Sequence, residues 1–226
     1  MRRSEIEAII EKSLAVMGAE GFRLPSFAGW TPAQWREQAV ATKALRAAGL
    51  GWNIVEFEKD AFFRSGIAVF TLRMGDYREL SRGGGRLYAE KAFVLFESQR
   101  VPHHYHRVKT EDLINRGGGV LGVNLVKVDA DGKPLAEAIT LERNGIEVSV
   151  PADTTLHLEP GESVVLPPGL AHAFIGVNEV LCGEISLAND DATDNYFLEP
   201  LPVPSPILED VPARHLVLAD YRSLAS

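Results

Sequence analysis

Apolar and polar residues alternate with a period of two from about Ile67 onward, in segments such as IAVFTLRM, KAFVLFES, VLGVNLVKV, IEVSV and SVVLP. This spacing puts every second side chain on the same face of a strand, and turn-forming Gly, Pro and Asp separate the segments. The Asp131-Gly132 pair between two segments is typical of a hairpin, because glycine adopts positive φ at little steric cost. The pattern predicts an all-β fold of many antiparallel strands that ends near Leu187.

The residues before the alternating region have helical spacing. Ser4 and Glu7 match a capping box, and apolar residues follow at helical intervals, so a first helix is predicted to end near Gly18. Thr31, followed by a proline, begins a second predicted helix that ends at Gly49. We therefore expect a helical extension in front of the strands.

The end of the chain is rich in proline. Five prolines lie within the stretch LEPLPVPSPILEDVPARHL, and proline donates no backbone hydrogen bond to a sheet, so this tail is predicted to wrap the surface in extended form. We expect one domain of 226 residues, with the helical extension over 1–60, the barrel over 61–199 and the tail over 200–226.

Composition limits the partners of the chain. The net charge of −8 and the absence of clustered Lys and Arg argue against nucleic-acid binding, which needs basic groups to replace counterions. Cys182 is the only cysteine, so no intrachain disulfide forms and a reducing cytoplasm is expected. No apolar run has the length of a signal peptide or a membrane span, so export and membrane insertion are not expected.

Two histidines in the stretch RVPHHYHRVKTE share a predicted strand face. His104 and His106 are two residues apart, whereas His103 has the opposite phase and is predicted not to be a ligand. Glu111 lies far enough along the chain to return a carboxylate to the same centre. The three glycines at 117–119 are predicted to form a tight turn afterwards.

A fourth candidate ligand follows a second turn. The stretch GESVVLPPGLAHAF is predicted to be a strand, a Pro-Pro-Gly turn and a return strand that carries His172. Three imidazoles and one carboxylate suit Mn, Fe, Co, Ni or Zn, and such a set leaves coordination positions open. The residues therefore predict one divalent metal held by His104, His106, Glu111 and His172, in a site able to support chemistry.

These residues and their spacing resemble the two motifs of the cupin superfamily, which implies a jelly-roll (double-stranded β-helix) barrel. His104, His106 and Glu111 fit the first motif with a glycine at 118, and His172 fits the second with Gly161, Pro167 and Gly169. Two turn positions depart from the motifs: Ser98 replaces the first glycine, and Gly176 stands where an asparagine belongs.

A narrower resemblance is to the D-lyxose isomerase family, carried by HYHRVKTEDLINRGGG, EISLANDD and Asp194-Asn195. It spans residues 91–197. The resemblance implies an Mn²⁺-dependent aldose–ketose isomerase that interconverts sugars such as D-lyxose and D-xylulose, and a homodimer.

Five further residues are candidates for handling the sugar. Glu184, in an apolar strand after His172, is the predicted catalytic acid–base, and Lys109 is predicted to protonate or hydrogen-bond a substrate oxygen. Lys91, Asp190 and Asp194 are the predicted substrate ligands. A metal-assisted hydride shift would need no base, and the sequence does not separate the two routes.

Two other functions fit the same ligands. A cupin Fe(II)-dependent dioxygenase would use them to hold iron for O₂ chemistry, and a non-enzymatic sugar-binding cupin would use the metal only to organise a pocket. The charged residues predicted around the metal favour a polyol substrate.

Overall fold

The computed structural model describes residues 1–83, 85–203 and 206–224. Its described strands form one 12-stranded sheet with the path β1-β2-β3-β11-β5-β10-β7-β8, and β4, β6, β9 and β12 pair beside this path. All of the named strand pairs are antiparallel. This arrangement confirms the predicted all-β class. The strands are β1 (Gly51–Glu56), β2 (Gly66–Met74), β3 (Tyr88–Leu95), β4 (Arg100–Tyr105), β5 (Glu111–Val128), β6 (Pro134–Leu135), β7 (Ile139–Arg143), β8 (Ile146–Val150), β9 (Thr154–Leu158), β10 (Ser163–Leu166), β11 (Leu170–Leu187) and β12 (Tyr196–Phe197).

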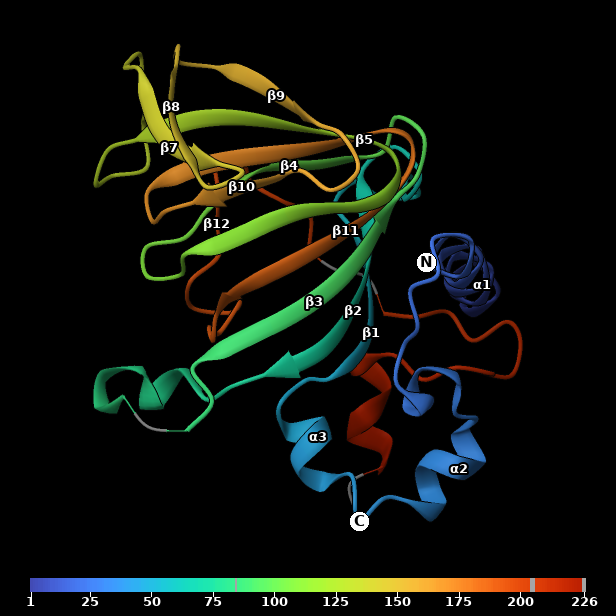
Figure 1. Cartoon of the computed structure of the whole chain (residues 1–226). Coiled ribbons are helices and arrows are strands. Elements are labelled where there is room, and N and C mark those ends of the chain that lie inside the picture. The colour runs from blue at the N-terminus through green and yellow to red at the C-terminus, as the bar shows by residue number, and fades with distance from the viewer. Residues whose placement is uncertain (84, 204–205, 225–226) are drawn as a thin grey trace.

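Two long strands, β5 and β11, organise the sheet. Each has 18 residues, and they pair with each other while β11 also pairs with β3 and β4. The sheet curls around an apolar interior (Figure 1). Inward-facing side chains such as Phe93, Leu121 and Val180 fill this interior, as alternation predicts.

The glycines at 117–119 do not form the predicted tight turn. They lie inside β5, which bends there and continues, while its pairing with β11 shifts register near Val177. Gly118 has a φ of +84°, and a Cβ at that position would lie 2.4 Å from the carbonyl oxygen of Glu179. Glycine is therefore required because the two strands approach closely at a bulge.

Helix α1 (Arg3–Ala19) lies against the outer face of the sheet (Figure 1). Its Ile9 and Ile10 pack with Phe70 and Val94 in a second apolar cluster. The helix ends as predicted, but the predicted cap is wrong. The Glu5 carboxylate accepts the Arg2 backbone N–H at 2.6 Å, so the helix begins earlier than predicted.

The proposed cap residues contact the C-terminal tail instead. The Ser4 hydroxyl donates to the Asp210 carboxylate at 2.6 Å, and the Glu7 carboxylate accepts from the Nδ1 atom of His215 at 2.8 Å. Tertiary contacts have thus replaced a local motif that sequence spacing suggested.

The second predicted helix is divided in two. Thr31 caps α2 (Pro32–Glu37) as predicted, since its hydroxyl accepts the Gln34 N–H at 3.3 Å. Helix α2 then ends, and a short α3 (Lys43–Ala47) precedes Gly49. Val40, between the two helices, is 92% exposed, so the predicted apolar stripe is interrupted.

Strand β1 lies inside the range predicted as helical extension, and that boundary was wrong. It pairs with β2 from Gly51 opposite Thr71 to Glu56 opposite Gly66. The strand is one edge of the sheet path, and its stability depends on this long-range pairing, which local spacing does not reveal.

The C-terminal tail lies against α1 and contacts its first turn. Backbone pairing joins Arg3 to Leu208, and the buried Arg3 guanidinium donates to the carboxylates of Glu209 and Asp220. The tail ends in a 3-10 helix, Leu218–Leu224, which the sequence did not predict.

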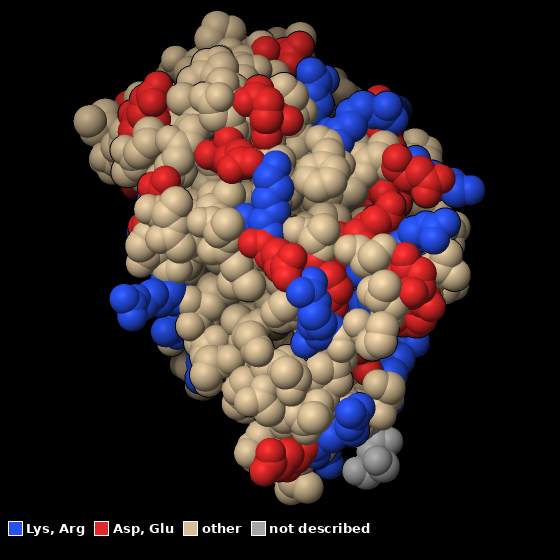
Figure 2. All heavy atoms as spheres, turned by 90° about the vertical axis from the view of Figure 1, so that its right-hand side faces the viewer, with Lys and Arg blue, Asp and Glu red and all other residues tan. Residues whose placement is uncertain are grey.

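Figure 2 shows the face that carries α1, where acidic and basic side chains are interspersed. Lys12, for example, pairs with Glu179 at 2.8 Å, and Arg214 pairs with Glu11 at 2.5 Å. This face carries no single basic patch. Among the described residues, no helix combines the length and the apolar character needed to cross a bilayer.

We predict that Glu7→Gln destabilises the fold at neutral pH by about 1–3 kcal/mol, because it breaks a buried charge-assisted network with His215 and two backbone N–H groups. Burial raises the pKa of Glu7, but these hydrogen bonds outweigh burial and hold the pKa below its ordinary value of 4.5. The stabilisation is therefore complete above pH 4.5 and is lost as the pH falls through the lower, folded pKa.

Urea unfolding of both proteins across pH 3–8 measures this effect. The difference between them is expected to shrink at acidic pH. Glu11→Gln, on the exposed side of α1, is the matched control and is expected to change the unfolding free energy by less than about 1 kcal/mol. An equally stable Glu7→Gln protein at neutral pH would contradict the role of this contact.

Candidate metal centre and active site

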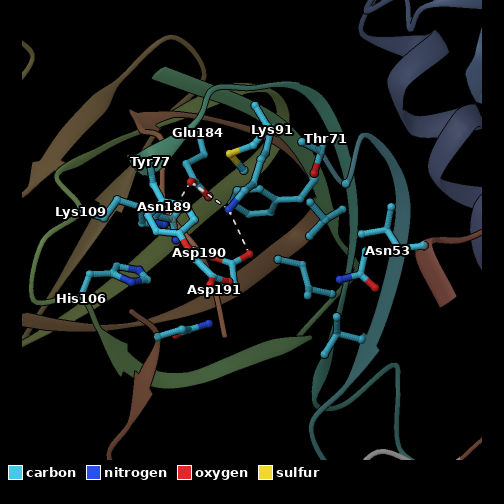
Figure 3. Close-up of a pocket in the computed structure, with 18 of the residues that line it drawn as sticks. Asn53, Thr71, Tyr77, Lys91, His106, Lys109, Glu184, Asn189, Asp190 and Asp191 are labelled. Carbon is cyan, nitrogen blue, oxygen red and sulfur yellow. Dashed lines mark hydrogen bonds and ion pairs between the residues drawn. The ribbon is translucent and has the colours of Figure 1, made fainter. Parts of the chain in front are cut away.

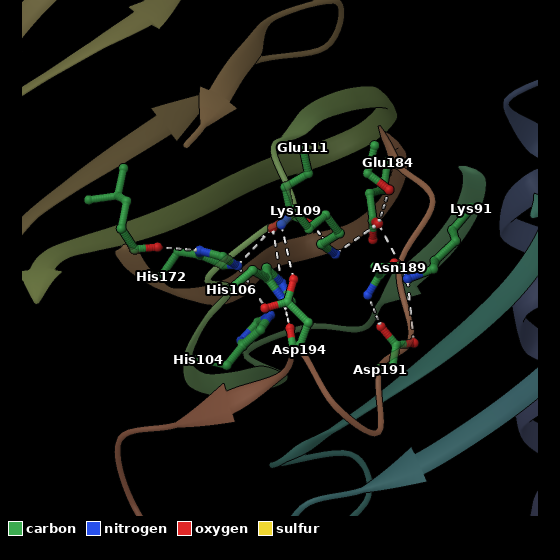
Figure 4. Close-up of polar contacts among 12 residues, drawn as sticks. Lys91, His104, His106, Lys109, Glu111, His172, Glu184, Asn189, Asp191 and Asp194 are labelled. Atoms are coloured by element: carbon green, nitrogen blue, oxygen red, sulfur yellow. Dashed lines mark hydrogen bonds and ion pairs between the residues drawn. The ribbon is translucent and has the colours of Figure 1, made fainter. Parts of the chain in front are cut away.

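The four predicted metal ligands meet inside the barrel. His104 lies on β4 opposite His172 of β11, His106 follows the end of β4, and Glu111 begins β5. All four are at most 9% exposed, and one potential ligand atom from each lies within 4.8 Å of the others. Figure 4 shows these side chains converging from β4, the residue after it, β5 and β11.

Backbone carbonyls orient the three imidazoles. Nδ1 of His104 lies 3.0 Å from the Pro102 oxygen, Nδ1 of His172 lies 2.9 Å from the Leu170 oxygen, and Nδ1 of His106 contacts the Asp194 oxygen. Because a carbonyl only accepts, each Nδ1 carries the proton and each Nε2 presents a lone pair. This outer contact fixes ring orientation in metal-binding histidines.

The ligand atoms that face one another at the centre of the site lack suitable hydrogen-bond donors among the described residues. His106 Nε2 and Glu111 Oε1 are buried without a hydrogen bond, and Nε2 of His172 lies 3.1 Å from Nε2 of His104 and 2.9 Å from Glu111 Oε1. Lone pairs held this close repel one another unless a cation or proton lies between them, and buried unpaired groups are costly. The donor set therefore fits a divalent metal with open coordination positions.

The protonation states suit metal binding at neutral pH. Burial lowers the pKa of His104, and the nearby His172 lowers it further; burial together with the Lys109 ammonium lowers the pKa of His106. Burial alone would raise the pKa of Glu111, but Lys109 and His172 hold it well below its usual range. His104 and His106 are therefore neutral imidazoles and Glu111 is an ionised carboxylate, the forms that bind metals.

An alternating chain of charges leads from the metal ligands to the loop after β11. Lys109 Nζ lies 2.5 Å from Glu111 and 3.1 Å from Glu184, and Lys91 Nζ lies 3.3 Å from Glu184 and 3.6 Å from Asp191. Lys91, Lys109 and Glu184 are each at most 8% exposed. These two lysines are therefore paired inside the barrel.

Only one carboxylate oxygen of the catalytic candidate Glu184 accepts hydrogen bonds from the described residues. Its Oε1 accepts from Lys109 and from the Ser186 hydroxyl at 2.9 Å, while no hydrogen bond of the described residues involves Oε2. Glu184 lines a cavity of about 820 Å³ together with His104, His106 and both lysines. Figure 3 shows Glu184 and Lys91 meeting in this cavity.

The loop after β11 contributes two residues that sequence reasoning did not select. Asp191 and Asn189 line the cavity beside Asp190, and the Asn189 amide donates to Asp191 at 2.7 Å. Lys91 lowers the pKa of Asp191 to about 2. Local spacing did not single out Asp191, because its partner Lys91 lies a hundred residues earlier in the sequence.

Asp194 has a role that differs from the predicted one. It does not line the cavity, and its carboxylate accepts backbone N–H groups of Arg107 at 2.7 Å and Lys109 at 3.0 Å. Its carbonyl oxygen orients His106. We therefore assign Asp194 to positioning the ligand loop and no longer propose it as a sugar ligand.

The two departures from the cupin motifs lie in a turn, at Ser98, and inside strand β11, at Gly176. Ser98 has a φ of +59°, the left-handed region that the motif glycine would adopt easily. Gly176 is hemmed in, since a Cβ there would lie 2.6 Å from the Phe96 oxygen. His103 contacts Asn124 at 2.6 Å and stays outside the ligand set, in agreement with its phase.

Solved structures share the fold. The L-ribose isomerase of Cellulomonas parahominis superposes with a TM-score of 0.53 at 14% identity over 88% of this chain and 93% of that chain, and the Geodermatophilus obscurus L-ribose isomerase gives 0.52 at 12% identity over 88% and 92%. Fold and site together define a cupin barrel with a three-histidine, one-glutamate centre.

The sequence comparisons are more specific. The D-lyxose isomerase family profile matches residues 1–221. The chain is 38% identical to the D-lyxose/D-mannose isomerase of Escherichia coli O157:H7 over 98% of this chain and 99% of the relative, and 37% identical to that of Serratia proteamaculans over 98% of each. The chain therefore belongs to the D-lyxose isomerase family.

We predict that His106→Ala loses its divalent metal while the barrel stays folded. Loss of an outer partner already weakens metal affinity by about 10–100-fold, so loss of a ligand is expected to weaken it at least as much. Elemental analysis of the purified proteins, with circular dichroism as the fold check, measures this. His157→Ala, on the exposed side of β9, is the control, and metal retained at wild-type stoichiometry in His106→Ala would remove His106 from the ligand set.

Proposed function

We propose that this protein is a metal-dependent aldose–ketose isomerase of D-lyxose and D-xylulose, or of a related sugar such as D-mannose. The observation that carries the proposal is the juxtaposition of four converging ligands with Glu184 and two buried lysines in one cavity. The names of the curated relatives support the reaction class.

Isomerisation moves a proton between C1 and C2 of the open-chain sugar. A divalent cation held by His104, His106, Glu111 and His172 would polarise the carbonyl and stabilise negative charge on the sugar oxygens. Glu184 Oε2, the oxygen without a hydrogen bond to the described residues, takes the proton from one carbon and returns it to the other. The Glu184 carboxylate is held in place through its other oxygen.

Lys109 and Lys91 have different roles in the proposed reaction. Lys109 donates toward a substrate oxygen at the reacting end, because its ammonium lies between the metal ligand Glu111 and the base Glu184. Lys91 and Asp190 bind hydroxyl groups further along the sugar. Asp191 keeps the Lys91 ammonium directed into the cavity.

We test the reaction by incubating the metal-loaded protein with pentoses and hexoses in D₂O, under argon. We expect ketose product from D-lyxose or D-mannose, with deuterium at the carbon that receives the proton. No conversion of any sugar would contradict the isomerase. Conversion without label would favour a hydride shift, which needs no base.

Glu184→Gln separates chemistry from metal binding. Because glutamine cannot accept the proton, we expect kcat to fall by at least about 100-fold, with metal content unchanged. Glu147→Gln, exposed on β8, is the matched control for the same chemical change. Normal turnover by Glu184→Gln would remove this residue from the mechanism.

Family membership favours the isomerase over a cupin Fe(II) dioxygenase or a sugar-binding cupin without activity. We further propose Mn²⁺ as the native ion, with Zn, Fe, Co or Ni able to enter the same nitrogen and oxygen set. We also propose a homodimer in a reducing cytoplasm. Metal analysis of protein purified without added ions, and light scattering in solution, test the ion and the dimer.

A further inference from the structure

The cavity continues beyond the groups that the proposed reaction uses. It runs from His104 and His106 to the inner faces of β1 and β2, where Asn53 and Thr71 line it. Figure 3 shows Asn53 and Thr71 on the opposite side of Lys91 from His106 and Lys109. This far wall has no role in moving a proton between C1 and C2.

Strand register places Thr71 in line with the reacting groups. Glu184 of β11 pairs with Lys91 of β3, and Lys91 pairs with Thr71 of β2, so the three inward side chains form one row across the sheet. Two strand spacings separate the ends of this row, roughly 10 Å between backbones. An extended six-carbon sugar anchored beside Glu184 is long enough to reach the far end.

Thr71 and Asn53 are polar at positions where their strands otherwise bury apolar groups. Val69 and Ile67 precede Thr71 on the inward face of β2, and Val55 follows Asn53 on β1. Thr71 is only 5% exposed and Asn53 is half-buried, and among the described residues no hydrogen bond forms to the Thr71 hydroxyl or the Asn53 amide. Neither polar group is sealed away from the cavity that it lines, so both are available to hydrogen-bond a ligand that enters it.

The local geometry of the two strands shapes this end of the cavity. Gly51 lies opposite Thr71, and the Tyr221 hydroxyl fills the space where a side chain at Gly51 would lie. Asn53 is the next residue of β1 on the same face. A register shift follows Thr71, where Thr71 pairs with Lys91 but Arg73 pairs with Glu90. Such a bulge redirects side chains, and both Thr71 and Met74 line the cavity as a result.

We propose that Thr71 and Asn53 form a subsite for the terminal hydroxymethyl group of a six-carbon sugar, and so set the preference between hexoses and pentoses. This inference rests on the proposed isomerase, because Glu184 and Lys109 define the reacting end. D-Lyxose and D-mannose are the matched probes, since they share configuration at C2, C3 and C4 and differ by one terminal hydroxymethyl unit. Only the longer sugar reaches Thr71.

The test compares Thr71→Val with the unsubstituted enzyme on both sugars. Valine keeps the branched shape and removes the hydroxyl, so kcat/KM for D-mannose is expected to fall about tenfold and that for D-lyxose by less than about twofold. Asn53→Ala is expected to act in the same direction and serves if Thr71→Val fails to fold. Thr140→Val, exposed on β7, is the matched control.

Calorimetric binding of the two alditols, made by reducing D-mannose and D-lyxose, tests the subsite without turnover. Thr71→Val is expected to weaken binding of the six-carbon alditol alone. Equal losses for both sugars and both alditols, or no loss for either, would overturn the subsite. If the unsubstituted protein turned over neither sugar, the proposed function would fail, and alditol binding would still decide the subsite.

Discussion

Three imidazole nitrogens and one carboxylate oxygen are held against each other inside the barrel, and this arrangement is stable only with positive charge among them. Each imidazole is fixed by a backbone carbonyl at Nδ1, so rotation cannot relieve the crowding at Nε2. Strands β4 and β11 supply His104 and His172 together with the carbonyls that orient them, and the loop after β11 supplies the third carbonyl from Asp194. The fold thus positions the cation site through backbone groups of two strands and one loop.

Strand β11 connects the metal ligands to the rest of the site. It carries His172 opposite His104, and further along it carries Glu184 opposite Lys91. A single 18-residue strand therefore sets the position of a ligand, of the proposed base and of the row that leads to Thr71. The bend at the glycines of β5 lets its partner strand follow this course.

Sequence alone predicted the features that depend on local phase. Alternation gave the strands and placed His104 and His106 on one face, and the two motifs located Glu111 and His172. Strand β1 and the division of the second helix were missed, because both depend on contacts with β2 and the tail. Asp191 was missed for the same reason, since its charge partner Lys91 is remote in sequence, and Asp194 was misassigned because nothing local indicates its three backbone donors.

X-ray absorption spectroscopy of the manganese-loaded protein tests the converging ligand set most directly. We predict one tightly bound ion per chain, whose scattering pattern contains three imidazole rings bound through nitrogen and at least one carboxylate oxygen. An ion surrounded only by oxygen, or by fewer than three imidazoles, would contradict the site on which the proposed isomerase depends.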